Sequence, residues 1–169
     1  MAADITNVKL GVCNITFNDV DLGHTKGGVV VTYTPEYHDV TVDKFGNTIV
    51  EKVLIGEKLT VKAPIAEATM SNLAVAMPVT SGDTSKTTIG DQVGTALATL
   101  AKQLVLHPIA NDAADLSEDV VLYKAIVGSE IALDYTYDGE RIVEVTFEAL
   151  LDESRSAGDY LGLIGDSTT

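Results

Sequence analysis

Short runs that alternate apolar with polar residues, or that are rich in β-branched residues, recur along this chain. Both patterns are typical of β-strands with one buried face. The runs are residues 28–34, 37–42, 48–55, 58–63, 103–109, 120–127, 130–137 and 141–150. Pro35 predicts the end of the first run, and Pro108 places the end of the run at 103–109 near a sheet edge. The pattern predicts a mainly β protein.

A long β-hairpin is predicted in the first half of the chain. Residues 37–42 and 48–55 both alternate, and a turn-rich segment separates them. That segment consists of Asp43, Lys44, Phe45, Gly46 and Asn47. Its composition predicts an exposed, charged tip.

One helix is predicted after the run at 58–63. Pro64 begins a stretch with Glu67 in its first turn and apolar residues near helical spacing, and Pro78 ends it. Residues 80–91 are polar and rich in Gly, Ser and Thr, which predicts a surface loop. Further on, Asp138-Gly139 joins two of the three late runs, so we expect these runs to form an antiparallel meander.

A chain of 169 residues is long enough for one domain with its own core. We expect this domain to span residues 1–152 and a C-terminal arm to span 153–169. The arm carries one apolar patch, which would be exposed unless it docks on something. The patch is Tyr160, Leu161, Leu163 and Ile164.

Hydrophobic residues make up 46% of the chain and its mean hydropathy is +0.19, but its apolar runs are short. We therefore expect a soluble globular protein with no membrane span. The first residues lack the apolar block of a secretory signal, so we expect no export of the chain. Cys13 is the only cysteine, so no internal disulfide can form, and this composition suits assembly in a reducing cytosol.

The chain is strongly acidic, with a net charge of -14 and a pI near 4.3. Residues 63–169 hold 17 of the 25 acidic residues but only 5 of the 11 basic ones. Proteins that wrap phosphate backbones do so with clustered Lys and Arg. This composition therefore predicts repulsion of nucleic acid.

Candidate chemistry is sparse. His24, His38 and His107 lie on different segments without metal-ligand spacing. The acidic run at 111–119 lacks the glycine turn and ligand order of a calcium loop, so a solvated charge run is the better interpretation. We expect no catalytic residue, no cofactor and no metal, and an enzyme is the least supported class.

The order of these parts resembles that of a known family. The telling stretches are GVVVTYTPEYHDVTVDKFGNTIVEKVLIGEKLTVKAPIAEATMSNLAVAMP, then QLVLHPI, then RIVEVTFEALLD. Together they resemble the tail tube (major tail) proteins of long-tailed bacteriophages. The resemblance covers residues 11–152 and is strongest at 27–78 and 143–152.

The resemblance implies a β-sandwich or barrel with one flanking α-helix and a long projecting hairpin. Such subunits form hexameric rings whose inner strands join into one β-barrel, and the rings stack into a hollow tube that the DNA genome passes through. The implied partners are other copies of the chain and the tape measure, terminator, and baseplate or tip proteins. DNA would be in transit without specific binding, and the location would be the virion tail after assembly in the host cytoplasm.

Within that family architecture, three surfaces gain expected roles. The tip at residues 43–47 would contact the adjacent ring, and the C-terminal patch would contact a neighbour. The acidic residues that we expect to face the lumen are Asp134, Asp138, Glu140 and Glu144. Two alternatives stay open: a related ring protein, such as a tail terminator or a secretion tube, and a soluble β-sandwich binding module. The low aromatic content of 5% weakens the second alternative.

Overall fold

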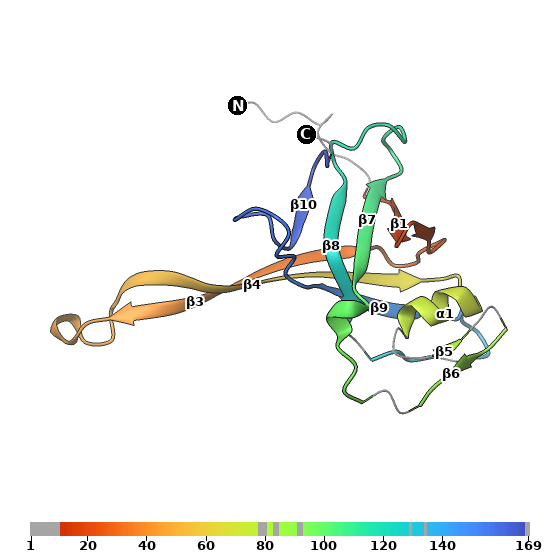
Figure 1. Ribbon diagram of the computed structural model, residues 1–169, viewed down its shortest axis with the longest axis horizontal. Helices are drawn as coiled ribbons and strands as arrows, with labels where there is room; N and C mark the ends of the chain where they lie inside the picture. Colours follow the sequence, from red (N-terminus) through yellow and green to blue (C-terminus); the bar gives the residue numbers. More distant parts are fainter. Residues whose placement is uncertain are drawn as a thin grey trace.

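The computed structural model describes residues 11–77, 81–82, 85–90, 93–128, 130–133 and 135–167 (Figure 1). The strands are β1 (Cys13–Phe17), β2 (Val20–Asp21), β3 (Val30–Thr41), β4 (Ile49–Ile65), β5 (Ser81–Gly82), β6 (Thr87–Thr88), β7 (Lys102–Pro108), β8 (Val120–Val127), β9 (Val143–Ala149) and β10 (Gly162–Ile164). One α-helix, α1, spans Met70–Ala76 in the described residues, and short 3-10 turns lie at Asp43–Phe45 and Leu97–Thr99. The predicted mainly β composition, the single helix and the long hairpin are confirmed.

Eight of the strands form one antiparallel sheet in the order β2-β1-β7-β8-β9-β4-β3. The eighth strand, β10, pairs with the first half of β8, where Gly162 lies opposite Leu122. The other half of β8 pairs with β9, where Val127 lies opposite Phe147. Within the described residues the sheet curls but does not close. The expected barrel or sandwich is therefore an open, curled sheet in the single subunit.

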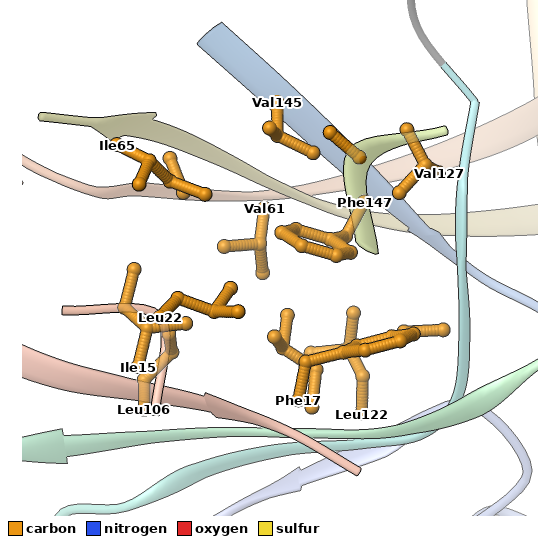
Figure 2. Close-up of a cluster of buried hydrophobic side chains, with 14 of the residues drawn as sticks. Ile15, Phe17, Leu22, Val61, Ile65, Leu106, Leu122, Val127, Val145 and Phe147 are labelled. Atoms are coloured by element: carbon orange, nitrogen blue, oxygen red, sulfur yellow. The ribbon is translucent and has the colours of Figure 1, made fainter. Parts of the chain in front are cut away.

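The core lies inside this curl. Figure 2 shows Ile15, Phe17 and Leu122 facing Val61 and Phe147 across the interior. These side chains are buried because every second residue of their strands points inward. The Phe17 and Phe147 ring centroids lie 5.3 Å apart. Each such side chain contributes about 1.5–3 kcal/mol when it is fully buried.

The chain after β2 brings the two ends of the curl together. Thr25 forms an isolated bridge with Ile65, and the backbone amide of Lys26 donates to the carbonyl oxygen of Pro64 at 3.0 Å. The side-chain amide of Asn72, on α1, donates to the carbonyl oxygen of Leu22 at 2.9 Å. The helix thus covers one end of the core.

The predicted start of the helix is wrong. Pro64 lies within β4, opposite Glu144 of β9, because the alternating pattern of β4 continues to Ile65. The helix begins at Met70, after Thr69 caps it by accepting a hydrogen bond from the backbone amide of Asn72 at 3.2 Å. Part of the predicted loop at 80–91 lies outside the described residues, and its described part includes the short β5–β6 pair.

Two predictions that were based on prolines also differ from the structure. Strand β3 continues through Pro35 to Thr41, because β3 is an edge strand and an edge tolerates a missing amide donor. Strand β7 lies between β1 and β8 rather than at an edge. Its Pro108 is the last residue of the strand, where no further ladder hydrogen bond is lost.

The predicted three-stranded meander does not form. Strands β8 and β9 pair directly, and the described residues of 130–137 contain no strand. Ile131 and Leu133 instead pack on the core from this connecting segment. Every second side chain of this segment points inward, as in a strand, but its backbone does not pair with another strand. The alternating sequence therefore resembled that of a strand.

Candidate assembly surface

The most distinctive surface is a two-stranded projection, which we call the ribbon and define as residues 36–55. Strand β4 has 17 residues, but β9 pairs only with those from Thr60 to Ile65. Beyond that point β4 has only β3 as its partner among the described residues, and the pair extends far from the rest of the sheet (Figure 1). The predicted hairpin is therefore confirmed, and none of its described residues belongs to the core cluster.

Apolar side chains are exposed along the whole ribbon. They lie on both of its faces, because neighbouring residues such as Val53 and Leu54 are both apolar and successive residues of a strand point to opposite faces. The exposed fractions of these side chains run from 42% to 65%. They belong to Tyr37, Val42, Phe45, Ile49, Val50, Val53, Leu54 and Ile55. Isolated two-stranded ribbons are only marginally stable in water, so this one gains most from a partner.

Ion pairs on the solvent surface support the ribbon. The Lys52 ammonium lies 2.6 Å from Asp39, and the Lys58 ammonium lies 2.6 Å from Glu36. The hydrogen bond and charge of the Glu36 carboxylate raise the pKa of Lys58. Exposed pairs of this kind contribute little to stability, typically about 0–1 kcal/mol each. They add a little to the pairing of the strands but do not replace a hydrophobic partner.

The predicted contact residues at positions 43–47 form the ribbon tip. A 3-10 turn over Asp43–Phe45 ends at Gly46, whose φ of 60° and ψ of -131° suit only glycine. Phe45 is 54% exposed, and the Lys44 ammonium lies 5.5 Å from the centre of its ring. The tip therefore presents an aromatic ring with a cation beside it.

The three described residues among the predicted lumen-facing acids lie away from the ribbon. Asp134 lies outside the described residues, and Asp138 is exposed on the segment before β9. Glu140 lies 2.7 Å from the Lys26 ammonium, whose hydrogen bond lowers the pKa of Glu140. Glu144, on the outward face of β9, lies 2.8 Å from the Lys62 ammonium. The structure thus gives two of these acids lysine partners from distant parts of the sequence.

The C-terminal segment packs on its own domain. The Arg155 guanidinium lies 3.8 Å from the centre of the Tyr123 ring, and the Tyr123 hydroxyl donates to Asp159 at 2.6 Å. Asp152 accepts hydrogen bonds from Lys124 at 2.9 Å and from Ser154, and these lower its pKa to about 2. The segment then continues into β10.

Strand β10 brings the predicted C-terminal patch to the base of the ribbon. Gly162 is essential there, because a Cβ atom on it would lie 2.4 Å from the carbonyl oxygen of Val121. Next to this contact is a groove of about 440 Å³. Its lining residues are Tyr33, Glu57, Leu59, Gly158, Tyr160, Leu161, Gly162, Leu163 and Ile164. All four residues of the predicted patch line this groove, and Ile164 is 72% exposed.

The remaining candidate chemistry does not converge on a site. Among the described residues, no group of three or more His, Cys, Asp or Glu side chains is placed to hold a metal ion. The Nδ1 atom of His107 lies 2.7 Å from Asp119, which ties β7 to the acidic run at 111–119. In the described part of the chain, no helix has the length and apolar character needed to cross a membrane.

Fold and surface together define a β protein with an open, curled sheet and a projecting ribbon whose two strands pair only with each other among the described residues. No protein-family model matches the sequence, and the curated proteins contain no match to it. Function is therefore inferred from this geometry.

Proposed function

We propose that this chain is a structural virion protein that polymerises as stacked hexameric rings into a hollow phage tail tube. The single observation that carries the proposal is the ribbon. In the described part of the chain its apolar side chains are exposed, and a neighbouring subunit would cover them. A monomeric protein with this surface would be prone to aggregate, whereas an assembling subunit uses it.

The open sheet also supports assembly. Strand β3 forms one edge of the sheet over 12 residues, and among the described residues only β4 pairs with it. Unpaired edges are templates for another strand, and a ring of subunits that joins edge to edge removes them. The same join would complete a barrel that one curled sheet leaves open.

The acidity fits a conduit for DNA. Duplex DNA carries one negative charge per about 1.7 Å of its axis, so an acidic wall repels it. Lys26 and Lys62 offset Glu140 and Glu144, while Asp138 forms no ion pair in the described part of the chain. The wall in this proposal is therefore weakly rather than densely acidic, and DNA passes it in transit without specific binding.

Negative-stain electron microscopy of the purified protein, with its mass distribution in solution, tests this proposal. We expect hollow rods or stacked rings. Single rings that never stack would instead indicate a related ring protein such as a terminator. A strictly monomeric protein at high concentration would contradict the proposal.

A matched pair of variants links assembly to the ribbon. Val53→Asp places a carboxylate on the ribbon, and Val93→Asp places one on a loop where the side chain is 97% exposed. We expect the first to abolish rods and the second to leave them, because only the first puts an unpaired charge in a buried contact. Equal effects of the two substitutions would refute the role of the ribbon.

A further inference from the structure

The groove at the base of the ribbon has a distinct chemical character. Its walls are mainly apolar, with Tyr33 and Leu59 on one side and β10 on the other. Among its lining residues in the described part of the chain, Glu57 is the one charged group. The Tyr33 hydroxyl donates a hydrogen bond to that carboxylate and so holds it in the wall. Such a groove suits an apolar group that has a positive charge beside it.

The ribbon tip supplies this combination. Phe45 is the aromatic residue of the tip and is half exposed, and the Lys44 ammonium lies over its ring. A cation over an aromatic face is attracted to the ring, which favours keeping the two groups close together. Ring and cation match the apolar walls and the single carboxylate of the groove.

We propose that Phe45 of one copy docks in the groove of a second copy, with Lys44 next to Glu57. This inference rests on the proposed function, since it names the two surfaces through which copies of a self-assembling chain meet. The tip of a chain cannot reach its own groove. The ribbon runs away from its base, and Figure 1 places the tip at the far end of the molecule.

The charge of the tip favours this contact over one between the folded bodies of two copies. Asp43 and Lys44 are the charged residues of positions 43–47, so the tip is neutral overall, whereas the whole chain has a net charge of -14. Two acidic bodies repel each other, but a neutral tip can approach an acidic body. The contact therefore joins the neutral tip of one copy to the acidic body of another.

The geometry limits the type of assembly. Two copies that place their tips in each other's grooves form a closed two-fold dimer, whereas a tip-to-groove contact that passes from copy to copy is heterologous and forms rings or filaments. The proposed tube requires the second arrangement.

Cross-linking between two variants tests the docking directly. In a full chain carrying Cys13→Ala, Asn47→Cys places a thiol beside Phe45 and leaves Phe45 and Lys44 intact. Ile164→Cys places a thiol on the exposed rim of the groove in a separate preparation. The two preparations are mixed and treated with a short bis-maleimide. The matched control mixes Asn47→Cys with Val93→Cys, whose thiol lies on an exposed loop.

We expect roughly tenfold or more cross-linked dimer in the first mixture than in the control, because docking raises the effective concentration of the two thiols. A yield no higher than the control overturns the inference. Strong cross-linking of Asn47→Cys with itself also overturns it, because tips would then meet tips. Electron microscopy of the same samples separates the two proposals. Rods without the expected cross-link refute the docking alone, and the absence of both refutes the tube as well.

Discussion

Truncation of the tip aromatic gives the most quantitative prediction. Full burial of a phenylalanine side chain contributes about 1.5–3 kcal/mol. Phe45 is 54% exposed in the subunit, so an assembly contact can bury about half of it. Phe45→Ala should therefore remove about 1–1.5 kcal/mol from each contact. Because 1.4 kcal/mol is a tenfold change in an equilibrium constant, the critical concentration for assembly should rise roughly five- to tenfold.

The same substitution should leave the folded subunit nearly unaffected. Phe45 is outside the core cluster, so the free energy of unfolding of the dissociated protein should change by less than about 0.5 kcal/mol. Light scattering against protein concentration gives the critical concentration, and urea denaturation below that concentration gives the stability. Tyr137→Ala is the matched control, because Tyr137 is a fully exposed aromatic residue away from the ribbon.

Two results would refute this reasoning. A critical concentration within twofold of the wild type, by the affinity relation about 0.4 kcal/mol, would mean that no neighbour covers Phe45. A loss of unfolding free energy above about 1 kcal/mol would mean that Phe45 supports the subunit itself, as buried side chains do.

Three further predictions concern the base of the ribbon and the C-terminal segment. Gly162→Ala should lower the free energy of unfolding, measured by urea denaturation, by about 1–3 kcal/mol, because the new Cβ would overlap a backbone carbonyl. Gly90→Ala is the control and should leave this free energy unchanged, because the space around Gly90 is open. Lys44→Glu and Glu57→Lys should each weaken assembly measured by sedimentation, and the double variant should recover it; an additive loss would argue against their pairing. The pKa of Asp152 is depressed to about 2, so its stabilisation is present above its unfolded pKa of about 3.9 and is lost as the pH falls towards 2. The difference in stability between wild type and Asp152→Asn should therefore shrink from pH 5 to pH 2, and a constant difference would contradict this.

Local patterns predicted the ribbon well. Alternation at 37–42 and 48–55 around a turn-rich centre was sufficient, because a hairpin is encoded by neighbouring residues. The strands near 103–109 and 120–127 were predicted for the same reason. The exposure of the apolar side chains on the ribbon could not be predicted, since it depends on where β9 stops pairing with β4.

The secondary-structure predictions were wrong where one local sequence pattern is compatible with two different structures. Pro64 can begin a helix or end a strand, and only its pairing with Glu144 decides between them. The alternation at Ile131 and Leu133 came from packing on the core without a ladder. Strand β10 carried a weak signal because it has only three residues, and the groove beside it depends on contacts between distant segments. The lysine partners of Glu140 and Glu144 could not be predicted either, because these ion pairs also join segments that are distant in the sequence.

Cryo-electron microscopy of the particles that the purified protein forms tests the central claim most directly. The account predicts a hollow, six-fold tube in which every ribbon is covered by a neighbouring subunit and every Phe45 ring is buried. Particles in which the ribbons point into solvent, or a protein that stays monomeric at any attainable concentration, would contradict it.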